Sequence, residues 1–155
     1  MGSSEPARAY VAKRIGDMER AFGGVFVRVR AELGITAFGV QVVELPPSSG
    51  ALAPEHDHLH DGQEELFVLL EGSAELALPD GALALDRDTF VRVAPETRRR
   101  LRSGPEGARV LIVGGTPGRV YAPPENTRLG GPEVPGCPTA STAMVPDGPA
   151  PQLST

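Results

Sequence analysis

Short strand-like runs, separated at close intervals by glycine and proline, dominate the first 121 residues of the chain. They cover residues 36–45, 65–70, 74–78, 83–85, 90–93, 98–102 and 110–113. The runs 65–70 and 74–78 are typical of a hairpin pair around Gly72 and Ser73, and Pro79-Asp80-Gly81 supplies the next turn. The number and spacing of these strands predict an all-β barrel or sandwich.

The first forty residues carry a less regular pattern. Residues 17–22 predict a helical turn closed by Gly23 and Gly24. Residues 26–30 alternate as a strand does, whereas residues 28–33, which end at Gly34, are typical of a capped helix. We favour the helix over 28–33 and expect a short helical decoration before the barrel.

The composition changes after Tyr121. Residues 122–155 hold half of the sixteen prolines and no aromatic residue, so this stretch has little apolar surface to bury. We therefore predict a flexible N-terminus over residues 1–7, one barrel domain over 8–121 and a disordered Pro/Gly-rich tail over 122–155.

Charge and hydropathy narrow the range of partners. The formal net charge is −5 and only 5% of the residues are aromatic, which argues against a nucleic-acid partner. No run of eighteen apolar residues occurs, and the start of the chain lacks the apolar stretch of a signal peptide. We expect a soluble cytoplasmic protein with no membrane partner.

All three histidines fall within one short segment, His56-Asp57-His58-Leu59-His60, and two carboxylates, Glu64 and Glu65, follow closely. Side chains two residues apart on an extended segment point to the same side, so the three imidazoles can converge. Imidazoles combined with one carboxylate suit first-row metals such as Fe, Mn, Ni or Zn. Histidines in a polar loop are otherwise simply solvated.

The segment from Gly50 to Gly72 resembles the first motif of the cupin superfamily, in which a histidine pair is followed by a glutamate and then a glycine. Counting back from Gly72 selects Glu65 with His58 and His60. Counting forward from Gly50 selects His56 and His58 instead. The resemblance implies an all-β cupin double-stranded β-helix, a jelly-roll-like barrel, with a metal held by Glu65 and two or three of His56, His58 and His60.

The second cupin motif departs from its pattern. Pro95 aligns with the motif, but Arg100 stands where the last metal-binding histidine is expected, and a guanidinium has no lone pair to offer a metal. The resemblance implies that Arg100 points into the barrel near Glu65, where it would bind an anionic substrate group. The alternative is that Arg98, Arg100 and Arg102 form a solvated strand face.

Two functional hypotheses follow from the resemblance. The first is a small metal-binding enzyme that acts on an anionic or carbonyl-containing metabolite as a dioxygenase, isomerase or cyclase, between which a fold cannot choose. The alternative is a non-enzymatic ligand-binding or sensory cupin whose metal site is degenerate. The resemblance also implies a homodimer.

Overall fold

The computed structural model describes residues 9–50 and 52–133 of the chain. The strands are β1 (Arg20–Ala21), β2 (Phe26–Val27), β3 (Gly39–Leu45), β4 (Glu64–Leu78), β5 (Gly81–Leu85), β6 (Phe90–Val93) and β7 (Arg100–Gly115). The helical elements are short and comprise α1 (Val29–Leu33) and the 3-10 turns η1 (Ile15–Asp17) and η2 (Glu125–Thr127). The described part of the chain is thus mainly β, as the spacing of its turn residues predicts.

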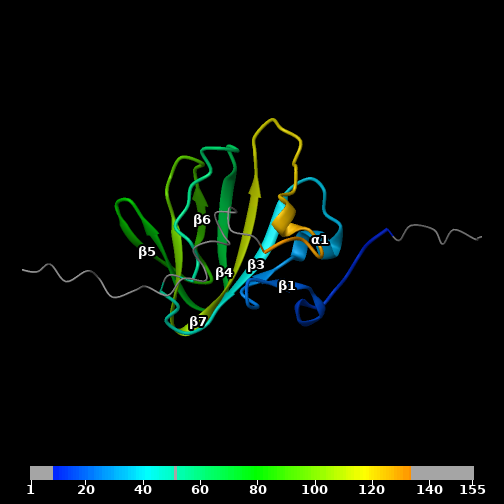
Figure 1. The fold of residues 1–155 in the computed structure, drawn as a ribbon. Helices are drawn as coiled ribbons and strands as arrows, with labels where there is room; N and C mark the ends of the chain where they lie inside the picture. Colours follow the sequence, from blue (N-terminus) through cyan, green and yellow to red (C-terminus); the bar gives the residue numbers. More distant parts are fainter. Residues whose placement is uncertain (1–8, 51, 134–155) are drawn as a thin grey trace, which may run out of the picture.

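The seven strands form one curved antiparallel sheet in the order β1-β2-β3-β7-β4-β5, in which β6 pairs with β4 as well (Figure 1). The long strands β4 and β7 pair along most of their length. On its other edge, β4 pairs with β6 over Glu65–Val68 and with β5 over Ala74–Leu78. One continuous strand therefore serves both halves of the barrel.

The strand β4 bends at Gly72, where its pairing with β7 shifts register on both sides of the glycine. Gly72 has a φ of 80°, and a Cβ atom at this position would lie 2.1 Å from the carbonyl oxygen of Gly107 on β7. Only glycine fits a left-handed conformation with a backbone so close. The predicted hairpin around Gly72 and Ser73 is therefore wrong, because bulges bend the strand without reversing it.

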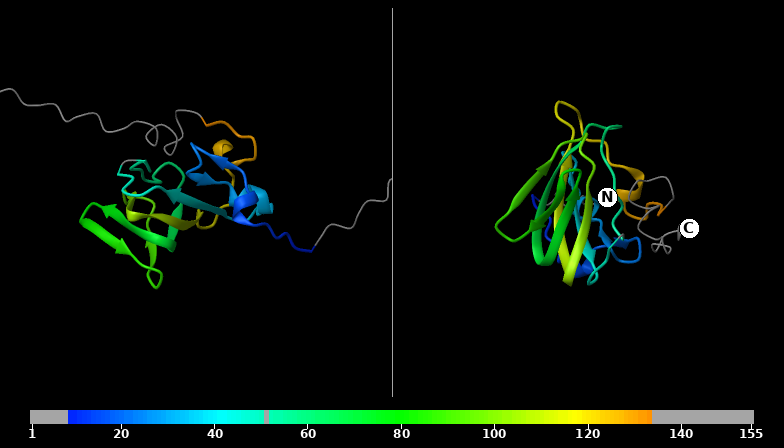
Figure 2. Two further views of the ribbon diagram at one scale, coloured as in Figure 1. Left: turned by 90° about the horizontal axis from the view of Figure 1, so that it is seen from below. Right: turned by 90° about the vertical axis from the view of Figure 1, so that its left-hand side faces the viewer.

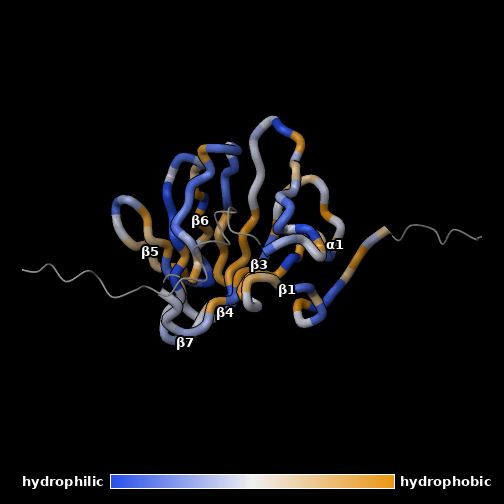
Figure 3. The backbone as a smooth tube through the Cα atoms, viewed as in Figure 1, coloured by the Kyte–Doolittle hydropathy of each residue, from blue (hydrophilic) through white to orange (hydrophobic). Residues whose placement is uncertain are grey.

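The apolar residues of β3, β4 and β7 meet inside the curve of the sheet (Figure 3). The largest buried core side chains there include Phe26, Phe67, Leu76, Leu101 and Val110. The hydrophilic stretches lie in loops and also along strand segments in the left half of this view. Leu52 and Ala53 of the loop between β3 and β4 also pack against this core.

The N-terminal segment agrees with the sequence in one part and differs in another. The expected helix is confirmed as α1, which ends at Gly34 in the left-handed conformation. The expected helical turn over 17–22 is wrong, because Arg20 and Ala21 form β1 and pair with β2. The chain reverses between these strands through Phe22, Gly23 and Gly24, all with positive φ.

Residues 122–133 lie against the N-terminal segment in place of forming the start of a disordered tail (Figure 2). The buried Arg28 side chain donates from Nε to the Asn126 carbonyl oxygen at 3.0 Å and from Nη2 to the Gly131 carbonyl oxygen at 2.9 Å. The predicted domain end at residue 121 is therefore too early. The segment 122–133 has no aromatic anchor, but its backbone carbonyls accept hydrogen bonds from buried arginines, and these bonds hold it in place. The predicted flexible residues 1–7 and the tail beyond 133 lie outside the described residues.

Among the described residues, every helix is too short or too polar to cross a lipid bilayer.

Candidate functional site

The histidine segment between β3 and β4 is fixed to the segment between β6 and β7 by backbone hydrogen bonds. His56 and Arg99 form an isolated antiparallel bridge, with N to O distances of 3.0 and 2.9 Å. The His58 amide donates to the Pro95 carbonyl oxygen at 2.8 Å, and Gly62, at a φ of 70°, closes a tight turn by donating to the His58 carbonyl oxygen. These contacts hold the imidazoles over the open end of the barrel.

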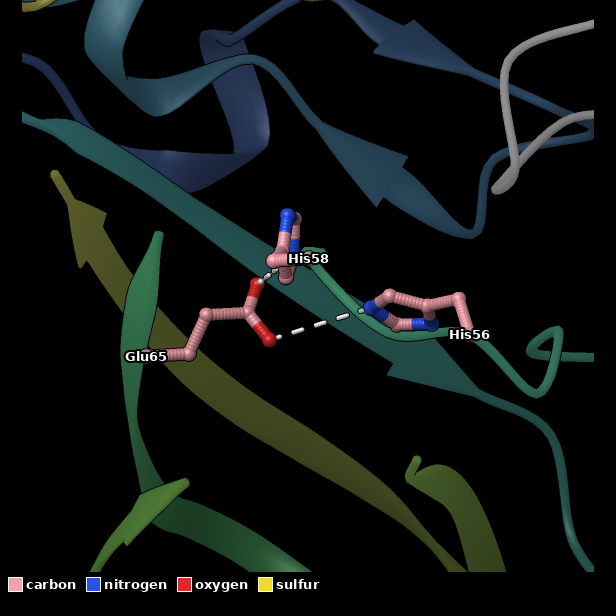
Figure 4. Close-up of side chains that lie close together, drawn as sticks. All are labelled: His56, His58 and Glu65. Carbon is pink, nitrogen blue, oxygen red and sulfur yellow. Dashed lines mark ion pairs between the residues drawn. The ribbon is translucent and has the colours of Figure 1, made fainter. Parts of the chain in front are cut away.

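Glu65, near the start of β4, points at two of the histidines (Figure 4). Its Oε1 lies 3.3 Å from His58 Nε2, and its Oε2 lies 3.7 Å from His56 Nε2. The two imidazole rings pack edge to face with their centroids 5.3 Å apart. One ligand atom from each of these three residues lies within 4.8 Å of the other two, which is close enough for all of them to contact one cation.

The other ring nitrogens of both histidines have partners that set the tautomer. His56 Nδ1 lies 3.1 Å from the Pro54 carbonyl oxygen, which can only accept a hydrogen bond. His58 Nδ1 lies 3.0 Å from Oδ1 of Asp61. In the neutral rings the proton therefore sits on Nδ1, and the Nε2 lone pairs face Glu65, as in metal sites where a carboxylate or carbonyl orients the ligating imidazole.

Burial and charge act against each other on these groups. Burial raises the pKa of Glu65, but the contacts with His56 and His58 outweigh it and lower that pKa to about 2. Burial lowers the pKa of His58, yet the Glu65 contact and the charge of Asp61 leave it raised above 6.5. The cluster therefore keeps an ionised carboxylate in a buried position.

Several buried polar atoms of the cluster have no hydrogen-bond partner within the described residues. They are His58 Nε2, Glu65 Oε2, and Nε and Nη1 of Arg99. Buried polar atoms are nearly always satisfied in native proteins, because an unpaired one costs the full desolvation penalty. Their concentration at one place indicates a site that completes its contacts with a bound group.

His60 takes a different position from the other two histidines. Its side chain is 62% exposed, and its Nε2 lies 3.2 Å from Oδ2 of Asp61 instead of near Glu65. It does stack on His58 and forms a second group with His58 and Asp61 that could hold a cation. Of the two registers that the sequence leaves open, the structure brings the pair His56 and His58 to Glu65.

The arginine beside Glu65 is Arg99, not Arg100. Arg99 is 0% exposed, and its Nε lies 3.5 Å from Oε2 of Glu65. Along β7, the partly exposed Arg100 and Arg102 alternate with the buried Leu101 and Ser103, so Arg100 is on the face away from the core. The predicted inward position of Arg100 is therefore wrong. The inward arginine follows Pro95 by four residues in this chain, and the motif predicts five.

The cluster lies in the wall of a cavity of about 290 Å³. Apolar side chains line much of it, among them Phe22, Phe26, Phe67, Leu101 and Ile112. Polar side chains of Gln41, Gln63 and Tyr121 also reach it, as do Asn126 and Thr127 from the C-terminal segment. The lining is thus largely apolar and also includes the His56, His58, Glu65 and Arg99 groups.

The residues absent from the candidate site predicted from the sequence include Arg99, Asp61, Tyr121 and Asn126. Arg99 could have been found from Leu101, because an apolar residue in an arginine run marks the strand face that turns to the core. Asp61 orients His58 from three residues away, a spacing that gives no signal without the loop conformation. Tyr121 and Asn126 reach the cavity only because the C-terminal segment folds back.

No protein-family model matches the chain, and no curated protein does. The chain does match solved structures. A cupin protein from Bacteroides fragilis matches with a TM-score of 0.57 and 18% identity over 76% of this chain and 92% of its own. A sugar phosphate isomerase of the cupin superfamily from Silicibacter pomeroyi matches with a TM-score of 0.51 and 22% identity over 63% of this chain and 59% of its own. At these identities the likeness concerns the fold alone.

Proposed function

The chain has the cupin fold, as its first motif suggests, and on this premise we propose that it binds a divalent first-row metal ion and acts on a small metabolite in the adjoining cavity. His56, His58 and Glu65 would hold the ion. Fe, Mn, Ni and Zn all accept such a mixed nitrogen and oxygen donor set. His60, which the sequence includes among the ligands, would remain outside this set.

The observation that supports the metal is the orientation of buried lone pairs. When their rings are neutral, His56 and His58 donate from Nδ1 to neighbouring oxygens, and both Nε2 atoms then present a lone pair to Glu65. In the neutral rings no proton lies between these acceptors, and the contacts of 3.3 and 3.7 Å are repulsive unless a cation or a proton joins them. The residues therefore fit a metal ion.

The chemistry of this donor set suits a metabolite with a carbonyl or anionic group. A bound metal would supply Lewis acidity toward such an oxygen, and three protein ligands leave coordination positions open. The chain itself supplies an apolar wall that excludes water. Its polar side chains in the same cavity orient the ligand.

A second candidate function is a metal-free ligand-binding or sensory cupin. Arg99 favours it, because the guanidinium lies 3.5 Å from Glu65 and can balance the carboxylate charge without a metal. His58, whose pKa is raised, can add a second positive charge. In this case the same cavity would bind its ligand through Arg99 and the histidines.

Metal titration separates the two functions. After treatment with a chelator and its removal, the wild-type protein should bind about one equivalent of Co²⁺ with d–d absorbance typical of a mixed imidazole and carboxylate site. His58→Ala should weaken that affinity by at least about tenfold, in line with the cost of losing even an orienting group. His60→Ala is the matched control and should bind nearly as tightly as the wild type. If the wild type binds no metal, the metal-free function is the correct one.

The homodimer implied by the cupin resemblance stays a prediction, as does the cytoplasmic location. Sedimentation equilibrium of the full chain tests the dimer, which should give twice the mass of 16.2 kDa.

A further inference from the structure

Arg99 is buried beside Glu65, yet its contacts within the described residues use only part of its hydrogen-bonding capacity. Its backbone bridges His56 in both directions, so the side chain is held at the same height as the histidine cluster. Within the described residues, the guanidinium makes one hydrogen bond, from Nη2 to the Ala94 carbonyl oxygen at 3.0 Å. The side chain is 0% exposed and lines the cavity.

Two donors of this buried guanidinium have no hydrogen-bond acceptor among the described residues. They are Nε and Nη1. Nε lies 3.5 Å from Oε2 of Glu65, yet the two groups are not aligned for a hydrogen bond. A buried charged donor without an acceptor is costly, so an oxygen acceptor from a ligand would satisfy what the protein leaves open.

We propose that Arg99 binds the carboxylate of a small monocarboxylate ligand whose apolar body lies against the aromatic wall of the cavity. The inference rests on the proposed function because it needs a ligand in this cavity, and it adds the class of that ligand. It assigns to Arg99 the anion contact that the sequence places at Arg100.

The charges around the cavity favour a single negative charge on the ligand. Among its described lining residues, Arg99 is the one permanently positive side chain, and Glu65 and Asp61 are acidic. A divalent cation on the cluster would leave one positive charge in excess, which one carboxylate balances. A phosphate dianion would exceed that balance and would leave an uncompensated buried charge.

The remaining wall determines the rest of the ligand. Phe22, Phe26 and Phe67 line the cavity together with Leu101 and Ile112. A volume of about 290 Å³ is at the small end of ligand pockets, so the cavity fits a compact molecule. A short aliphatic or aromatic acid has this combination of one anionic end and an apolar body.

Calorimetric titration with butyrate tests the proposal on the wild-type full chain, both loaded with Co²⁺ and metal-free. Butyramide is the matched control because it has the same shape without the charge. Butyrate should bind at least about tenfold more tightly than butyramide, the difference expected for a charge-assisted contact. Equal affinities, or tighter binding of inorganic phosphate than of butyrate, would overturn the proposal.

Two variants locate the contact. Arg99→Lys keeps the charge but loses the planar fork, and should weaken butyrate binding by about tenfold. Arg100→Lys, on the other face of β7, should leave it unchanged. An unchanged affinity in Arg99→Lys contradicts the proposal, and if that variant does not fold, the comparison of butyrate with butyramide in the metal-free protein decides. Arg99-dependent butyrate binding by a chain that takes up no metal would refute the metal site and support the anion contact.

Discussion

Glu65 combines burial with ionisation, and this combination makes its contribution to stability dependent on pH. Its pKa is about 2 in the folded chain against 4.5 for an ordinary glutamate. A depressed pKa stabilises the fold above pH 4.5, and this stabilisation is lost as the pH falls towards 2. In buffer that contains a metal chelator, protonation of Glu65 alone should therefore lower the free energy of unfolding of the wild type by about 2 kcal/mol between pH 6 and pH 3.

Urea unfolding of the wild type and Glu65→Gln at both pH values measures this contribution. The variant should be less stable at pH 6, because the buried Arg99 then loses the carboxylate that lies 3.5 Å from its Nε. Its stability should also fall less towards pH 3, because it lacks the carboxylate of Glu65. The other carboxylates titrate in both proteins and contribute equally to both. Parallel pH profiles would show that Glu65 does not carry the depressed pKa.

The residue scale also shows what the sequence can predict about the site. His56, His58 and Glu65 come together as expected, because their spacing is local and one loop and one strand position all three. The sequence places the inward arginine one residue too late, because counting from Pro95 does not measure the length of the turn before β7. A one-residue error exchanges the two faces of a strand, so the candidate ligand contact moved from Arg100 to Arg99.

Among the elements, the bend shared by β4 and β7 depends on Gly72. Alanine at this position would need a φ of 80° and would place its Cβ 2.1 Å from the Gly107 carbonyl oxygen. Gly72→Ala should therefore destabilise the fold by at least about 2 kcal/mol, from left-handed strain plus the displaced backbone. Equilibrium unfolding in urea measures the loss.

The matched control is Gly115→Ala at the end of β7, where a Cβ meets no atom within 4 Å and the backbone is not left-handed. This variant should stay within about 0.5 kcal/mol of the wild type, as is usual for surface changes. A similar loss in both variants would mean that the close approach at Gly72 does not limit the fold.

The same bend explains why the sequence divided the long strands. Gly72 and Gly107 are turn signals in any local interpretation, so β4 was predicted as two paired strands and β7 as two shorter ones. In the folded chain each long strand changes direction at a bulge and continues in the other half of the barrel. Whether a glycine reverses a chain or bends it depends on the partner strand, which a local pattern does not contain.

At the scale of the whole molecule, the C-terminal segment joins the N-terminal segment to the cavity. Gly130 donates its amide to Glu19 at 2.8 Å, and the buried Arg28 contacts Glu19 as well as the Asn126 and Gly131 carbonyl oxygens. The composition of residues 122–133 predicts disorder because it contains no aromatic anchor. Here the anchors are arginines of the N-terminal segment, which no property of the tail itself reveals.

A chain ending at residue 121 should therefore be less stable than a chain ending at residue 133. We expect a difference of about 3 kcal/mol in urea unfolding, because truncation removes two acceptors from the buried Arg28 side chain. Arg28→Met provides the internal check. It should destabilise the longer chain and reduce the stability of the shorter chain much less. The effects of two changes that remove the same contact are not additive. Equal midpoints for the two lengths, or the same cost of Arg28→Met in both, would mean that residues 122–133 are not part of the folded unit.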